Sequence, residues 1–337
     1  MFFQAGKLIF SPSDLVNFLD GDFGSWMDRW YIESKNGNSD VVNEFGLPLG
    51  VNFANINGVP DEQDGIDNNT DDRGAALTLK AMREGAEFIY QGRLGHGEFA
   101  GFADFLARTE GDSDLGDYHY EAWDTKLARS FKPYFIVQLC SYSEMITAVQ
   151  GQLPHSFSAV LGTGTIEQRS VQKFLYYFRS LRRRFLDFHN EFTIENFPHP
   201  GFATNHGRWS TFAKSYIEAT DHLSVVANIT RGQIKKLQAA GIDSVRNLAT
   251  TSTPYVPRMT QPVFERLKVQ ARLQLESKER DKPLFEVRPP SLDNPRLGLG
   301  LLPPPSPKDV FFDIEGYPFA EDGLEYLLGA ICIEDNQ

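Results

Sequence analysis

The sequence predicts an α/β protein in which helices flank a mixed sheet. Three short segments between residues 88 and 125 alternate or run apolar between Gly and Asp turns, which is typical of an antiparallel meander. Residues 135–149 are apolar at helical spacing, and residues 157–161 form a short apolar run that ends at a Gly-Thr-Gly turn. Residues 171–188 then predict a long amphipathic helix.

The residues ahead of the meander predict helices around an irregular segment. The run from Ser11 to Asp14 is a helix N-cap signal, because Ser and Asp accept the free amide hydrogens of a first turn. We expect this helix to continue through Trp30. Residues 34–72 are rich in Gly, Asn and Asp without a period and predict irregular structure, and residues 73–84 predict a short helix.

The bulk composition indicates a folded protein with an acidic surface. The chain has 337 residues, of which 41% are hydrophobic, so it can bury a sizeable core in more than one domain. A net charge of -12 means that any nucleic-acid binding must come from local basic patches. We expect a cytoplasmic protein with no membrane partner, because the sequence shows neither a signal peptide nor a membrane-spanning apolar run.

Two acids and a lysine in the predicted meander have the chemistry of a metal-dependent hydrolase. Phosphodiester hydrolysis uses a divalent cation, and hard cations bind carboxylate oxygens. Asp124 and Lys126 lie two residues apart on a predicted strand, so both side chains leave the same face. A hairpin with residues 110–117 as its connection would bring Asp104, at the end of the preceding strand, beside Asp124. Taken alone, either motif is also typical of a surface turn or strand end.

The next predicted helix adds two polar residues on one face. Gln138 and Tyr142 are four residues apart, so they lie one above the other on that helix. The order of a strand Asp, a strand Asp-x-Lys and a helix Gln-x-x-x-Tyr resembles the RecB-like branch of the PD-(D/E)XK nucleases. The resemblance extends over residues 8–250, and residues 120–129 carry its most specific string.

This resemblance implies a restriction-endonuclease-like fold and a role for each motif residue. Asp104 and Asp124 would ligate Mg²⁺ or Mn²⁺, and Lys126 would be the catalytic lysine. Gln138 and Tyr142 would contact the substrate strand or brace the site. DNA and a helicase domain or subunit would be the partners.

The sequence departs from the family at the first metal ligand. Relatives usually have a His, often followed by Glu, on a helix ahead of the meander, and this chain lacks that pair. Either His96 or a residue such as Glu44 takes its place, or the metal site is incomplete. Glu121 is a further acid, but it is out of phase with Asp124 on the strand.

A second departure concerns the iron-sulfur cluster that many relatives hold with four Cys. The matching positions here are Gly21, Thr204, Gly207 and Ala213. We therefore expect no iron-sulfur cluster, and we expect packing to hold the N-terminal segment against the later one. Cys140 and Cys332 are expected to be reduced, buried thiols.

Residues 58–72 resemble the Asp- and Asn-rich calcium loops of thrombospondin type 3 repeats. Closely spaced side-chain oxygens around a Gly turn suit Ca²⁺. The residues that would bind it are Asp61, Asp64, Asp67 and Asp71. The alternative is a mobile acidic segment.

Two further segments have features of DNA contacts. Residues 229–245 predict two short helices joined by a Gly-Ile turn, similar to a helix-hairpin-helix unit. Its phosphate contacts would be Arg231, Lys235 and Lys236, unless the segment is an ordinary packing hairpin. Arg182, Arg183 and Arg184 either line a strand channel with nearby aromatic residues or form the solvated face of a helix.

The patterns divide the chain into four parts. Residues 1–218 would form the nuclease domain, residues 219–255 the helix-hairpin-helix-like unit, and residues 256–308 a helix with a Pro-rich linker. Residues 309–337 predict a truncated ribonuclease H-like segment, in which Asp313 and Glu315 are vestigial exonuclease acids without independent activity.

The function expected is a metal-dependent nuclease that cuts single-stranded or end-containing DNA as part of a repair or helicase-associated polypeptide. The alternatives are a catalytically impaired DNA-binding module on the same fold and a calcium-binding interaction protein.

Overall fold

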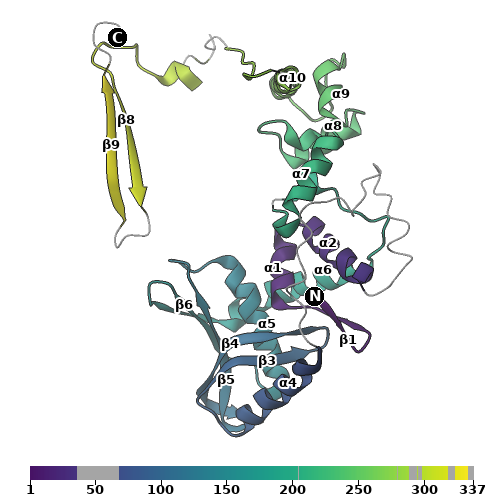
Figure 1. Ribbon diagram of the computed structural model, residues 1–337, viewed down its shortest axis with the longest axis vertical. Helices are drawn as coiled ribbons and strands as arrows, with labels where there is room; N and C mark the ends of the chain where they lie inside the picture. The colour runs from purple at the N-terminus through teal and green to yellow at the C-terminus, as the bar shows by residue number, and fades with distance from the viewer. Residues whose placement is uncertain are drawn as a thin grey trace. The chain divides into compact units, whose positions relative to one another are not determined.

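A computed structural model of the chain describes residues 1–35, 68–203, 205–278, 280–287, 294, 298–317 and 323–332. The contacts divide the chain into two units, Met1–Glu279 and Arg280–Gln337. The first unit contains the predicted meander and nearly all of the helices, which are labelled in Figure 1.

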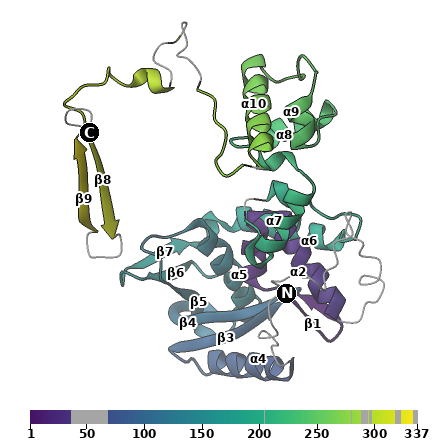
Figure 2. The same ribbon diagram turned by 45° about the horizontal axis from the view of Figure 1, so that its top comes forward.

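A five-stranded mixed sheet with the strand order β3-β4-β5-β6-β7 lies in the first unit (Figure 2). Its strands are β3 (Phe88–His96), β4 (Phe99–Ser113), β5 (Gly116–Lys126), β6 (Ser156–Leu161) and β7 (Ile166–Ser170). Strands β5 and β6 pair in parallel, and the other neighbours pair antiparallel. The predicted α/β class and the antiparallel meander are confirmed.

One strand prediction was wrong and one strand was missed, because polar residues hid the pattern. The predicted connection at residues 110–117 instead pairs, since β4 continues to Ser113 and meets β5 through a tight turn. Asp104 therefore lies within β4 and not at its end. Strand β7 was not predicted, because its sequence is mostly polar and its strand pairing comes from β6.

Helices cover the sheet and complete the main core. Helix α5 (Pro133–Gln150) connects the parallel strands β5 and β6, and it contacts strands β3, β4, β5 and β6 of the sheet. Helix α4 (Asn68–Arg83) contacts β3, beside which it lies in Figure 1. Helices α1 (Pro12–Asp20) and α6 (Leu175–Asn190) pack against α5. No helix among the described residues is long and apolar enough to cross a membrane.

The predicted N-terminal helix is interrupted. Helix α1 ends at Gly21, whose φ of 141° favours glycine, and α2 (Asp22–Lys35) follows in a new direction. A hairpin of β1 (Phe2–Gln4) and β2 (Lys7–Ile9), which was not predicted, precedes α1.

Helix α4 begins earlier than predicted, at Asn68, because Asn and Asp are favourable in a first helical turn. Asp71 therefore lies on α4. The other candidate calcium ligands, Asp61, Asp64 and Asp67, lie outside the described residues.

An aromatic cluster holds α2 against α7 (Ser210–Ala219). The cluster consists of Phe23, Trp26, Met27, Trp30, Trp209, Phe212, Ala213 and Tyr216. Trp209 also donates a hydrogen bond of 2.8 Å to Asp28. The predicted packing between these segments is thus observed, with Ala213 fully buried inside it. Thr204 lies outside the described residues.

Three further helices share a separate apolar core. They are α8 (Arg231–Ala239), α9 (Val245–Thr250) and α10 (Gln261–Ser277). The predicted turn between the first two is present, with Gly241 at a φ of 78° and Ile242 buried behind it. Short 3-10 turns span Val171–Lys173, Pro200–Phe202, Gly207–Trp209, Leu223–Val225 and Gly298–Leu301.

The second unit contains an antiparallel hairpin of β8 (Val310–Tyr317) and β9 (Leu324–Cys332). Every residue of both strands is exposed, including the predicted exonuclease acids Asp313 and Glu315. Cys332 is exposed, which contradicts the expectation that both thiols are buried, because no second layer covers this hairpin among the described residues.

A buried histidine in the first unit predicts acid sensitivity. His189 is 3% exposed, and its Nε2 lies 2.9 Å from Oγ of Ser25. Burial, with a smaller contribution from Arg29, lowers the pKa of His189 to about 3 from an ordinary value of 6.5. Below pH 6.5 His189 is protonated in the unfolded chain, whereas in the folded chain it stays neutral down to about pH 3. Stability should therefore fall as the pH falls through this window.

A His189→Gln variant should lose this titration. The free energy of unfolding of the native chain, relative to the variant, should decrease by up to roughly 1.4 kcal/mol for each pH unit between about pH 6 and pH 4. Urea denaturation of both chains over that range measures the difference. Parallel pH profiles would contradict the assignment of a neutral buried His189.

Candidate active site

The candidate site lies where β4 and β5 stop pairing. The pairing ends at Phe105 and Trp123, and Asp104 is the residue directly before Phe105 on β4. Oδ2 of Asp104 accepts hydrogen bonds of 3.0 Å from the amide of Thr125 and 2.9 Å from its hydroxyl. Oδ1 accepts a 3.2 Å bond from Nε2 of Gln91 on β3. The Asp104 carboxylate on β4 is therefore held in place by residues of both neighbouring strands, β3 and β5.

Asp124 and Lys126 form a buried ion pair at the end of β5. Asp124 is 4% exposed, and its Oδ2 lies 2.6 Å from Nζ of Lys126. This oxygen has no hydrogen-bond partner in the described part of the chain. Its contact with Lys126 is therefore an ion pair whose angles do not meet the geometry of a hydrogen bond. A buried carboxylate oxygen in this state can accept a cation.

Helix α5 contributes two residues that orient the others. Oε1 of Gln138 accepts a 2.9 Å hydrogen bond from Nζ of Lys126, which directs the ammonium. The hydroxyl of Tyr142 donates a 2.7 Å bond to the carbonyl of Phe102, two residues before Asp104 on β4. Of the two predicted roles for Tyr142, the described contact matches bracing of the site.

The two carboxyl groups are close enough for each to shift the pKa of the other. Burial and, less strongly, a hydrogen bond with Asp104 raise the pKa of Asp124 to about 7, although Lys126 acts in the opposite direction. Burial also opposes ionisation of Asp104, but hydrogen bonds from Asp124, Thr125 and Gln91 outweigh this and lower its pKa. The pair therefore ionises first at Asp104 and holds its remaining proton on Asp124.

This arrangement fits a divalent cation with a small set of protein ligands. Asp104 and Asp124 offer carboxylate oxygens, and Mg²⁺ is often bound by one or two carboxylates with water in its other positions. The described residues contain no group of three His, Cys, Asp or Glu side chains that could hold a metal. His96 pairs with Phe99, so it lies about 15–17 Å along the strands from Asp104 and does not supply the missing ligand. Glu44 lies outside the described residues.

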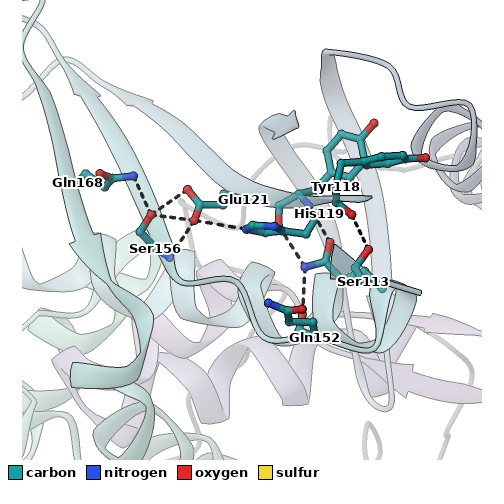
Figure 3. A network of polar contacts seen from close by, with 9 residues as sticks. Ser113, Tyr118, His119, Glu121, Gln152, Ser156 and Gln168 are labelled. Atoms are coloured by element: carbon teal, nitrogen blue, oxygen red, sulfur yellow. Dashed lines mark hydrogen bonds and ion pairs between the residues drawn. The ribbon is translucent and has the colours of Figure 1, made fainter. Parts of the chain in front are cut away.

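Glu121 belongs to a separate polar network and not to this site. Its Oε1 accepts bonds of 3.0 Å and 2.8 Å from the amide and hydroxyl of Ser156, and Gln168 donates a 2.7 Å bond to the same hydroxyl. Figure 3 shows Glu121 directed toward Ser156 of β6. Nε2 of His119 lies 3.9 Å from Oε1 of Glu121. Glu121 thus joins β5 to β6 as a structural residue.

The predicted DNA-binding residues lie on α6 and α8. Arg182 pairs with Glu144 of α5, and Arg179 lies 2.6 Å from the same carboxylate, whereas Arg183 and Arg184 are exposed. Nζ of Lys236 donates a 2.6 Å bond to the carbonyl of Arg258. The side chains of Arg231 and Lys235 are exposed on α8.

Gln91 and Thr125 also belong to the candidate site, although the sequence does not predict either of them. By strand alternation, Thr125 is expected to face away from Asp124 and Lys126, so the sequence does not predict its hydrogen bond with Asp104 on β4. Gln91 has a φ of 49°, and this positive value interrupts β3 at the residue that reaches Asp104. The alternation of residues along a single strand predicts neither of these contacts, because both join different strands.

Comparison of the chain with models of protein families and with curated proteins found no match.

Proposed function

We propose that the chain is a divalent-metal-dependent nuclease that hydrolyses phosphodiester bonds of DNA. The observation that supports this most strongly is the convergence of Asp104, Asp124 and Lys126 where β4 and β5 separate. Two carboxylates beside an oriented ammonium supply the charges that phosphodiester hydrolysis requires.

Each residue has a separate task in this proposal. Asp104 and Asp124 would hold the cation, which when bound would supply Lewis acidity toward the phosphate and the attacking water. Lys126 stabilises the negative charge that develops on the phosphate oxygens, and Gln138 keeps its ammonium in place. Thr125 and Gln91 hold the Asp104 carboxylate in its binding direction.

The alternative function is a DNA-binding module without turnover. It is favoured by one observation, that only two acidic side chains meet in the described part of the site. In that case DNA would bind, but no added cation would produce cleavage.

Cleavage of end-labelled single- and double-stranded DNA tests the proposal. The intact chain is incubated with Mg²⁺, Mn²⁺ or EDTA, and products are resolved on denaturing gels. We expect cleavage with a cation and none with EDTA. DNA binding without cleavage under any cation would replace the nuclease proposal with the binding module.

A further inference from the structure

Helix α5 carries a line of three side chains at four-residue spacing, which are Tyr134, Gln138 and Tyr142. Residues at this spacing lie above one another, about 6 Å apart along the helix axis. Gln138 accepts the hydrogen bond from Lys126 of β5, and Tyr142 donates one to the carbonyl of Phe102 on β4. Two members of the line therefore touch the two strands that carry the candidate site, and Tyr134 extends the line by one helical turn past Gln138.

The Tyr134 ring is linked to Lys126 through one intervening ring. Nζ of Lys126 lies 5.5 Å from the centroid of the Phe135 ring, and the rings of Phe135 and Tyr134 have centroids 4.6 Å apart at an angle of 82°. Phe135 is completely buried, so this edge-to-face contact holds the Tyr134 ring in place. Because the Lys126 ammonium is directed at α5 itself, Tyr134 lies on the same side of the sheet as that ammonium.

Tyr134 is the exposed end of this line. It is 44% exposed, whereas Tyr142 is 6% exposed and Gln138 is half-buried. An aromatic ring that is held at one edge and open to solvent elsewhere offers a stacking surface at a low cost in side-chain entropy. A ligand that occupies the candidate site and extends past Lys126 along α5 therefore meets this ring.

The sequence around Tyr134 is basic, although the chain is acidic overall. Residues 125–143 contain no Asp or Glu, but they include Lys126, Arg129 and Lys132. The acids that produce the net charge of -12 thus lie in other parts of the chain. A phosphate backbone beside Tyr134 is therefore not repelled by the segment that carries this ring.

We propose that Tyr134 stacks on an unpaired base of the DNA strand in the candidate site and thereby selects single-stranded over duplex DNA, an inference that rests on the proposed nuclease function. Every base offers a flat face to an aromatic ring, so this contact does not depend on sequence. In an intact duplex, neighbouring base pairs cover these faces. A strand that is unpaired at Tyr134 gains a contact that a duplex lacks, and its backbone then passes beside Lys126.

Binding of fluorescent oligodeoxythymidine to the full chain in EDTA tests this inference without cleavage. Tyr134→Ala should weaken binding about tenfold, and Tyr134→Leu, which keeps an apolar contact with Phe135 but has no aromatic face, should weaken it as much. Tyr134→Phe should bind as the native chain does, because stacking needs the ring and not the hydroxyl. In cleavage assays, Tyr134→Ala should raise KM by a similar factor and leave kcat within about threefold. Tyr176→Ala is the matched control and should behave as the native chain, because Tyr176 is 80% exposed on α6, which supplies no residue to the described part of the site.

Three results would overturn the inference. They are equal binding by Tyr134→Ala, Tyr134→Leu and the native chain, binding by Tyr134→Phe that is as weak as that of Tyr134→Ala, and a native chain that prefers duplex or does not bind the single strand. The nuclease proposal fails separately. If the native chain cleaves with Mn²⁺ while Tyr134→Ala keeps its affinity and KM, only the role of Tyr134 is wrong. If Tyr134→Ala loses affinity but no chain cleaves, only the nuclease chemistry is wrong.

Discussion

Asp124→Asn should lose two to three orders of magnitude in DNA cleavage while remaining folded. Asparagine keeps the shape of the side chain but removes the negative charge that a cation needs. Asp124 is 4% exposed, and its pKa is raised to about 7, so its charge is costly in the metal-free chain. The midpoint of thermal unfolding should therefore not fall, and single-strand binding in EDTA should persist.

Lys126→Ala should lose about as much activity for a different reason. It removes the ammonium that Gln138 orients, while both carboxylates remain. Matched controls on the same strand and the following loop are Asp117→Asn and Lys132→Ala, since both residues are exposed. These controls should cleave within a few-fold of the native chain under the same Mg²⁺ and Mn²⁺ conditions. Cleavage by Asp124→Asn or Lys126→Ala at the rate of the controls would remove these residues from the active site.

Phe185→Ala should destabilise the first unit by about 3–5 kcal/mol, the largest effect on stability that we expect. Phe185 is completely buried on α6, and its ring lies 4.7 Å from Phe10, 5.4 Å from Phe18 and 5.9 Å from Phe99. Its removal leaves a cavity between α6, α1 and the start of β4, which the surrounding rings cannot fill without moving.

Urea denaturation measures this loss. Tyr177→Ala on the same helix is the control, because Tyr177 is 57% exposed and its truncation should cost no more than about 0.5 kcal/mol. At temperatures where it is folded, Phe185→Ala should still cleave DNA. A loss of stability no larger than that of the control would show that the ring cluster does not contribute to the core.

The parts of the fold that could be predicted from the sequence are those with a strong period. The meander and helix α5 repeat their apolar residues at the spacing of a strand or a helix, so local chemistry is enough to define them. Strand β7 and the second half of β4 have polar sequences, and their backbone partners come from neighbouring strands. The apolar residues on both sides of Gly21 continue one helical pattern, yet the helix ends there because of the backbone angle of Gly21. The spacing of apolar residues cannot predict that angle.

By itself, the sequence determined which groups have the chemistry of the candidate site. The Asp-x-Lys spacing places Asp124 beside Lys126, and the four-residue helical spacing places Gln138 and Tyr142 on one face. Only the tertiary structure decided that Gln138 binds Lys126, that Tyr142 braces β4, and that Thr125 holds Asp104. The reason is physical, because spacing along one strand or helix orients side chains relative to that element alone. Contacts between elements depend on register and on where strands part, and these are set by the packing of the whole sheet.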